Sequence, residues 1–175
     1  KLNNKIKNSN AMHDVDITYI SPRGSWYQYS WKGDDNKSGG LLYNIGIHLF
    51  DLINYLFGNV EKTKLYYASR KCYSGYVRLK KANVRYFLSI DENHLNFLKN
   101  KNYDRTFKLL SVDNNEINLS KNFSNLHVLS YKNILNKKGF KINSIRTGIE
   151  ITYKIKKSKT VPLDLDCHPL TNKII

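Results

Sequence analysis

The chain has 175 residues, of which 41% are hydrophobic and 13% aromatic. This length suits one domain with a buried core, and the apolar content excludes a disordered chain. The formal net charge is +15, but the lysines are scattered among asparagines along the whole chain. We therefore expect no nucleic-acid partner, although so basic a balance is typical of nucleic-acid-binding proteins.

The sequence also argues against a membrane segment, a leader and a cysteine-based site. His48, Asp51 and Asn54 interrupt the longest apolar stretch, which leaves it short of the roughly 20 apolar residues of a membrane-spanning helix. The first residues, KLNNKIKNSNAMHD, lack the apolar centre of a secretory signal. Cys72 and Cys167 lie far apart without C-x-x-C spacing. We expect a cytoplasmic protein with no membrane partner, no metal and no disulfide.

The first elements are short. Residues 1–9 are lysine-rich and resemble the last turns of a helix. Residues 15–21, VDITYIS, alternate and are rich in β-branched and aromatic side chains, which predicts a strand. Residues 25–31, SWYQYSW, alternate in the same way after a Pro-Arg-Gly break, so we expect a second extended segment there.

The most informative stretch is an apolar helix predicted between the Gly39-Gly40 pair and Gly58. Asn44 and His48 stand four residues apart and therefore share one face of that helix. Asp51 and Tyr55 continue the same line. A polar stripe on an otherwise apolar helix indicates that this face borders a site. From the helical pattern alone, a core histidine bonded to a neighbouring strand is an equally good interpretation.

The rest of the chain predicts a sheet followed by helices. Short turns separate the strand-like runs, which favours an antiparallel meander over βαβ units. These runs are residues 60–69, 73–80, 84–91, 106–112 and 117–120. Helices are expected over residues 125–135 and 142–156, followed by an extended surface tail. The predicted fold class is α+β: an open, mostly antiparallel sheet with helices packed on one face. We expect the other sheet face to be apolar and to form a homo-oligomer interface.

Several motifs together resemble one protein family. SGGLLYNIGIHLFDLINYLFG resembles the C-terminal domain of the Gfo/Idh/MocA oxidoreductases, in which a glycine-rich turn leads to a helix with an Asp or Asn and, four residues later, a His. VDITYISPRGSWYQYSWKGDDNKSGG, VRYFLSIDEN, FSNLHVLSYKNIL and RTGIEITYKI are similar to one branch of that family. That branch oxidises C3 of UDP-2-acetamido-2-deoxy-D-glucuronate with NAD in O-antigen sugar synthesis.

The resemblance implies a division of labour between two domains. Family members carry an N-terminal Rossmann domain with a G-x-G-x-x-G fingerprint and a Glu-Lys-Pro motif whose lysine is catalytic, and this sequence contains neither motif. We therefore expect residues 1–14 to be the end of a connecting helix and residues 15–175 to be the substrate-binding and oligomerisation domain. NAD would bind mainly to the missing domain, and this chain alone would be inactive. The alternative is a non-catalytic oligomerisation or ligand-binding module of the same fold.

The resemblance also implies roles for individual residues. His48 would share the transfer of the hydroxyl proton with the lysine of the missing domain, because the pKa of an imidazole lies near neutrality. The resemblance leaves open which of the two is the base. Many relatives have Asp where this chain has Asn44, and an amide cannot accept a proton at neutral pH, so Asn44 is assigned to substrate binding.

Further contacts are expected from the segment before the helix. Arg23 and Lys32 are candidate contacts for the anionic groups of a UDP-sugar. Trp26, Tyr27 and Trp31 could form a wall for the ligand, or the two tryptophans could be core or subunit-interface residues. Asp91 and Glu92 are expected to make turn hydrogen bonds rather than to act as a catalytic pair.

Overall fold

A computed structural model describes residues 6, 11–98, 105–120, 126–139 and 141–175. The helix expected over residues 1–9 lies almost wholly outside these residues. The strands are β1 (His13–Ile20), β2 (Val60–Ala68), β3 (Cys72–Leu79), β4 (Ala82–Ser89), β5 (Phe107–Val112) and β6 (Asn115–Asn118). The α-helices are α2 (Trp26–Tyr29), α3 (Asp35–Ser38), α4 (Ile47–Phe57), α5 (Leu126–Leu135) and α6 (Ile142–Lys157). Shorter turns are η1 (Trp31–Gly33), η2 (Leu42–Gly46), η3 (Glu92–Phe97) and η4 (Thr171–Lys173). No described helix is long and apolar enough to cross a membrane.

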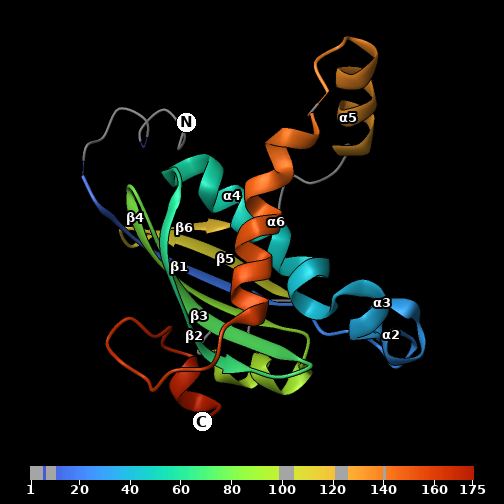
Figure 1. The fold of residues 1–175 in the computed structure, drawn as a ribbon. Helices are drawn as coiled ribbons and strands as arrows, with labels where there is room; N and C mark the ends of the chain where they lie inside the picture. Colours follow the sequence, from blue (N-terminus) through green and yellow to red (C-terminus); the bar gives the residue numbers. More distant parts are fainter. Residues whose placement is uncertain (1–5, 7–10, 99–104, 121–125, 140) are drawn as a thin grey trace.

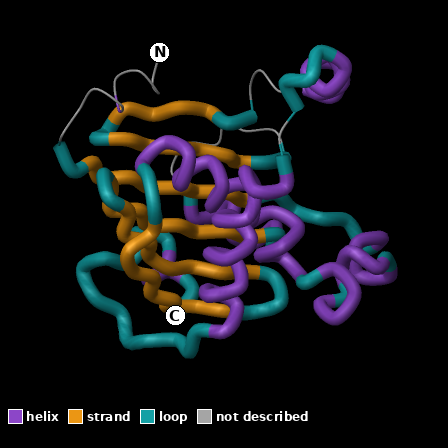
Figure 2. The backbone as a smooth tube through the Cα atoms, turned by 45° about the horizontal axis from the view of Figure 1, so that its top comes forward, coloured by secondary structure: helices purple, strands orange, loops and turns teal. Residues whose placement is uncertain are grey.

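The strands form one open sheet (Figure 2), and their order is β2-β3-β4-β1-β5-β6. Every neighbouring pair is antiparallel except β1 and β4, which run parallel. The mostly antiparallel α+β fold predicted from sequence is therefore confirmed. The parallel pair brings the carboxyl ends of two central strands to the same edge, from which the chain continues at Ser21 and Ile90.

Helices α4 and α6 cover one face of the sheet (Figure 1). Leu42, Phe50 and Ile53 are fully buried against the strand residues that face them, and these form a continuous apolar core. α6 crosses close to α4, since a Cβ added to Gly148 would lie 3.1 Å from Asp51 Cβ. In contrast, α5 buries none of its side chains and stands away from the sheet (Figure 1).

The segment predicted as a second extended run is instead helical. Residues 25–31 form α2 and the start of η1, with Tyr27 buried and its neighbours Trp26 and Trp31 57% and 59% exposed. A strand needs a partner, and β1 is already paired on both sides by β4 and β5. The backbone N–H and C=O groups of this segment therefore form hydrogen bonds with each other, such as the bond from Tyr27 N–H to Gly24 O. The core interpretation of the two tryptophans was wrong.

The sheet face opposite α4 and α6 has an apolar end and a polar end. At the apolar end Ile20, Cys72 and Phe87 are covered by Leu95 of η3 and Leu170 of the tail, so the expected exposed apolar patch was wrong. Successive side chains of a strand point to opposite faces of the sheet. At the polar end, the side chains that point away from α4 and α6 pair with each other. Arg85 Nε donates to Asp16 Oδ1 at 2.5 Å, and the Tyr76 hydroxyl donates to Asn83 Oδ1 at 2.6 Å. An oligomer interface on this face would have to bury charged groups that are already paired.

The C-terminal tail is bound more tightly than predicted. Val161 N–H donates to Leu65 O, and the Lys64 ammonium lies 2.6 Å from carboxylate oxygens of both Asp164 and Asp166. The bonds with Lys64 and with the Tyr66 hydroxyl hold the pKa of Asp164 at about 2. After Asp166 the chain turns toward the sheet, where His168 is buried, and covers one end of this sheet face.

One buried hydroxyl allows a test of the core. The Tyr86 hydroxyl is buried without a hydrogen-bond partner among the described residues, and burial raises its pKa. Tyr86→Phe should leave the free energy of unfolding unchanged or raise it by up to about 1 kcal/mol, because an unsatisfied polar group is removed. Urea unfolding followed by circular dichroism measures this. Tyr76→Phe is the matched control, with an expected loss of about 1 kcal/mol along with its bond to Asn83. A larger loss for Tyr86→Phe would contradict the prediction.

Candidate functional site

The predicted polar stripe lies on two kinds of helix. Gly39 and Gly40 both have positive φ angles, 79° and 75°, and turn the chain into a π-helical segment, η2, that contains Asn44. α4 begins at Ile47, so His48 lies in its first turn. π-helical turns inside α-helices occur frequently at functional sites. The sequence predicted a regular α-helix throughout and missed this widened turn.

His48 is exposed, so the alternative of a core histidine was wrong. Its side chain is presented from the rigid end of α4, whose opposite side is anchored by buried residues such as Leu49 and Phe50. Asp51, which shares the predicted stripe, instead lies against α6 at Gly148. Asp51 therefore does not share a surface with the other residues of the stripe. Asn44 and His48 remain the candidate wall of a site.

Asn44 holds the preceding loop in place. Its Nδ2 lies 3.1 Å from Lys32 O, 3.0 Å from Ser38 Oγ and 2.9 Å from Gly40 O. An amide nitrogen has two hydrogens, so these acceptors share them. The amide group thus fixes the loop that carries Lys32, and a substrate contact by Asn44 would have to use its Oδ1.

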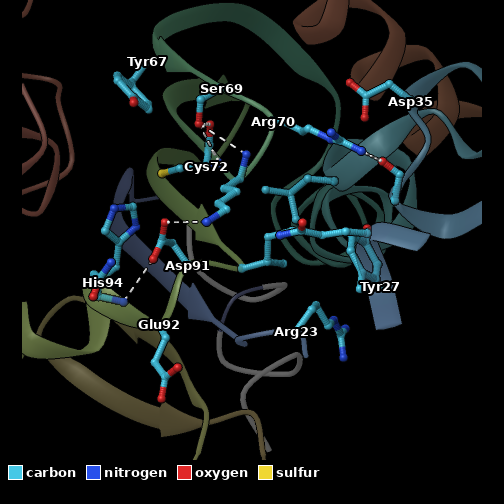
Figure 3. Close-up of a pocket in the computed structure, with 16 residues that line it drawn as sticks. Arg23, Tyr27, Asp35, Tyr67, Ser69, Arg70, Cys72, Asp91, Glu92 and His94 are labelled. Carbon is cyan, nitrogen blue, oxygen red and sulfur yellow. Dashed lines mark hydrogen bonds and ion pairs between the residues drawn. The ribbon is translucent and has the colours of Figure 1, made fainter. Parts of the chain in front are cut away.

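A cavity of about 690 Å³ lies at the carboxyl ends of β1 and β4 (Figure 3). Arg23, from the segment after β1, lines this cavity, and its role as an anion contact stays a prediction. Lys32 does not line it. Its ammonium lies over the Trp31 ring, 5.9 Å from the centroid, and the side chain is exposed. The structure therefore separates these two predicted contacts.

The cavity also contains polar residues that the sequence did not single out for a site. Arg70, in the β2–β3 turn, donates from Nη2 to Gly33 O at 2.8 Å. Lys71 lies beside it and pairs with Asp91 at 3.4 Å. Nothing in the local sequence marked these two cations, because the turn is brought to the end of β4 only by strand pairing.

Local bonds organise the opposite side of the cavity. Asp91 caps η3 by accepting from Asn93 N–H, which confirms its predicted turn role. Burial acts to raise the pKa of Asp91, but the bonds from Asn93 and Lys71 outweigh burial, so the pKa is lowered overall. His94 Nδ1 lies 2.8 Å from Ser89 Oγ, and burial lowers the pKa of this imidazole. At neutral pH this side therefore presents an ionised carboxylate and a neutral histidine.

Neither cysteine lies in a metal-binding group or beside a histidine partner in the described part of the chain. No group of three His, Cys, Asp or Glu side chains in the described part of the chain is placed to hold a metal ion. Cys72 is buried, and burial raises its pKa to about 12, so it is a protonated thiol at neutral pH. The neighbouring residues Cys167 and His168 do not form a pair, because the His168 side chain bonds to Thr18.

Comparisons with known proteins agree with this fold. Residues 3–94 match the family model described as the oxidoreductase family, C-terminal alpha/beta domain, of Gfo/Idh/MocA proteins. A WlbA (WbpB) dehydrogenase from Thermus thermophilus, solved with NAD and α-ketoglutarate, is 33% identical over 96% of this chain, with a TM-score of 0.88. The T. thermophilus WlbA (WbpB) dehydrogenase solved with NAD and UDP-GlcNAcA is 32% identical over the same share, also with a TM-score of 0.88.

A more distant structure shows the same fold. The WlbA dehydrogenase from Bordetella pertussis, solved with NADH and UDP-GlcNAcA, is 16% identical over 93% of this chain, with a TM-score of 0.64. The present chain spans 55%, 54% and 59% of these three proteins. It therefore corresponds to little more than half of each relative.

Proposed function

Because the chain belongs to the Gfo/Idh/MocA oxidoreductase family, as its C-terminal α/β domain, we propose that it is the substrate-binding half of an NAD-dependent dehydrogenase acting on UDP-GlcNAcA. The reaction is oxidation of the sugar at C3, as a step in the synthesis of lipopolysaccharide O-antigen sugars. The observation that carries the proposal is the exposed His48 on α4 within a chain that is about one-third identical, over almost its whole length, to a dehydrogenase solved with NAD and UDP-GlcNAcA.

His48 suits the proton transfer that alcohol oxidation requires. The hydroxyl must lose its proton while hydride leaves the same carbon, and a positioned imidazole can accept that proton near neutral pH. His48 is solvent-exposed and lies one turn beyond the loop-holding residue Asn44, so a sugar ring has access to it. In this proposal Asn44, Arg23 and Lys32 bind the substrate, with Arg23 and Lys32 directed to its anionic groups.

The sequence contains no G-x-G-x-x-G turn, the motif of dinucleotide-binding domains. We assign NAD to the part of the protein that the relatives have and this chain does not span. A second copy of the chain is the expected partner.

Calorimetry with UDP-GlcNAcA tests the proposal on the 175-residue chain. Wild type should bind, and His48→Ala should weaken binding about tenfold through loss of one hydrogen bond to the sugar. His127→Ala, which removes an exposed histidine on α5, should leave binding unchanged. The chain alone should neither bind NAD tightly nor reduce it.

Two outcomes would reject the proposal. If neither wild type nor His48→Ala binds the UDP-sugar, the chain is a non-catalytic assembly module of the same fold. If the 175-residue chain binds NAD tightly or reduces it with UDP-GlcNAcA, then the assignment of cofactor binding to the other half is wrong.

A further inference from the structure

The glycine turn before η2 leads directly into the candidate wall of the site. Gly39 and Gly40 both have positive φ angles, and glycine has more backbone freedom than any other residue. Asn44 lies in η2 just after this turn, and His48 follows in the first turn of α4. The placement of both side chains therefore depends on what holds the glycine turn.

A lysine from another helix contacts this turn. Lys156, in the last turn of α6, donates from Nζ to Gly39 O at 2.8 Å. The same ammonium group lies over the Tyr43 ring, 5.5 Å from its centroid. Tyr43 belongs to η2 and immediately precedes Asn44. One cation thus contacts the chain on both sides of the point where η2 begins.

The helix that carries Lys156 is fixed in the core. Ile151 and Ile155 of α6 are almost completely buried and belong to the main apolar cluster. α6 also packs along α4 and η2 (Figure 1). Lys156 therefore connects a mobile type of turn to one of the most firmly packed helices of the chain.

The contacts of α6 lie on both sides of His48 along the chain. Gly148 of α6 lies against Asp51 of α4, and Lys156 lies against Tyr43. These two positions of α6 are about 12 Å apart along its axis. His48 lies between Tyr43 and Asp51 in sequence, so α6 supports the wall of the site before and after this histidine.

We propose that Lys156 is a positioning residue for substrate binding. It holds the turn at Gly39 so that Asn44 and His48 face the sugar together, and it does not itself touch the ligand. The inference rests on the proposed function, which places the sugar at these two side chains. When the bond to the turn is lost, the affinity falls in proportion to the fraction of chains that keep the binding geometry.

A lysine near a helix C-terminus also has a simpler interpretation. Cations stabilise the last turn of any helix through its free carbonyl groups, and α6 ends with Lys154, Lys156 and Lys157. The Lys157 ammonium lies over the ring of Tyr153, which belongs to α6 itself. Among these three lysines, in the part of the chain that the structure describes, Lys156 is the one whose ammonium bonds to a carbonyl outside α6. This bond distinguishes Lys156 from an ordinary cation at a helix end.

Calorimetry with UDP-GlcNAcA tests the role of Lys156 on the 175-residue chain. Lys156→Met keeps an unbranched side chain over Tyr43 but removes the donor, and it should weaken binding about fivefold, as when about one chain in five keeps the turn in place. Lys156→Arg should bind within about twofold of wild type, because a guanidinium can donate to the same carbonyl and stack on the same ring.

Lys157→Met is the matched control. It removes a neighbouring cation that also lies over a tyrosine ring, 5.9 Å from the centroid, without removing a bond to the glycine turn. It therefore measures any general loss of attraction for an anionic ligand, and it should bind UDP-GlcNAcA like wild type. Far-UV circular dichroism spectra of all three variants should match wild type.

NMR spectra of the ¹⁵N-labelled chain give a readout that needs no ligand. Lys156→Met should shift or broaden the backbone amide resonances of Gly39 and Gly40. It should also move the side-chain amide resonances of Asn44, whose Nδ2 donates to Gly40 O. Lys157→Met should leave all of these resonances in place.

The outcomes separate this inference from the proposed function. Wild-type affinity in Lys156→Met, equal weakening by Lys157→Met, no rescue by Lys156→Arg, or unchanged resonances at the glycine turn would each overturn it. If UDP-GlcNAcA binding depends on His48 but not on Lys156, the proposed function survives and the positioning role falls. If wild type does not bind UDP-GlcNAcA while Lys156→Met alone moves the resonances of the turn, the proposed function falls and the hold of Lys156 on the turn stands.

Discussion

Replacing Gly75 with alanine should destabilise the domain by about 3 kcal/mol or more. Gly75 lies in β3 between Leu65 of β2 and Tyr86 of β4. An added Cβ would lie 2.4 Å from Lys64 O and 2.4 Å from the Tyr86 hydroxyl oxygen, with the ring carbon Cζ at 2.6 Å. The Tyr86 ring is fixed edge-on against Phe50, with centroids 5.3 Å apart. Neither the strand backbone nor the ring can move away without disturbing the core.

Urea unfolding at neutral pH measures the effect, with Gly24→Ala as control. Gly24 is exposed, and a Cβ there would meet only the Trp26 ring, at 3.1 Å, so its stability should change by less than about 1 kcal/mol. The double variant Gly75→Ala with Tyr86→Phe should recover little, because the backbone contact at Lys64 O and the ring contact both remain. Full recovery would show that the hydroxyl alone accounts for the clash.

The sequence predicted best the elements whose apolar residues recur at a regular spacing along the chain. The glycine-bounded apolar helix exists because Leu49, Phe50 and Ile53 recur on one side of it and are buried. The π-helical turn at Asn44 was missed, since the residues of η2 have the same apolar period as an α-helix. Its position depends on tertiary bonds from Asn44 to the preceding loop, which no local pattern contains.

Non-local pairing explains the other differences. The polar end of the sheet face away from the helices could not be predicted because Asp16 and Arg85 lie 69 residues apart and meet only through the β1–β4 register. The same parallel pairing brings Arg23 and Asp91 to one edge of the sheet and so forms the cavity. His48 was identified from the family resemblance and the helical spacing together. Arg70 was not, because its turn carries no recognisable motif.

The stability of the chain should fall as the pH drops from 6.5 to 4, because of His168. This imidazole is 3% exposed. Its Nδ1 accepts from Leu170 N–H at 3.2 Å, so Nε2 carries the hydrogen and donates to Thr18 Oγ1 at 3.0 Å. Burial lowers the pKa of His168 to about 4; Asp16 acts to raise it and Arg85 to lower it, with smaller effects than burial. Protonation would break the Leu170 bond and place a charge in the core.

The direction of this change in stability follows from proton binding. Between pH 6.5 and 4 the unfolded chain protonates His168 while the folded chain does not, so acidification favours unfolding. The pKa difference corresponds to about 3 kcal/mol of stability, fully present above pH 6.5 and lost by pH 4. The lowered pKa of His94 adds a loss of the same sign. Asp164, whose pKa is about 2, keeps its stabilising contribution throughout this range and loses it only as the pH falls below the ordinary carboxyl pKa.

His168→Asn isolates this effect. An asparagine Oδ1 can accept the backbone N–H two residues later, as in an Asx turn, so the Leu170 bond is kept without a titrating group. The variant should be less stable than wild type at pH 7.5, owing to its smaller side chain, but should lose far less stability between pH 6.5 and 4. Urea unfolding at intervals across this range gives both curves. Parallel curves for the variant and wild type would show that His168 is not the group that destabilises the fold in acid, and would shift the explanation to His94, whose imidazole lines the cavity.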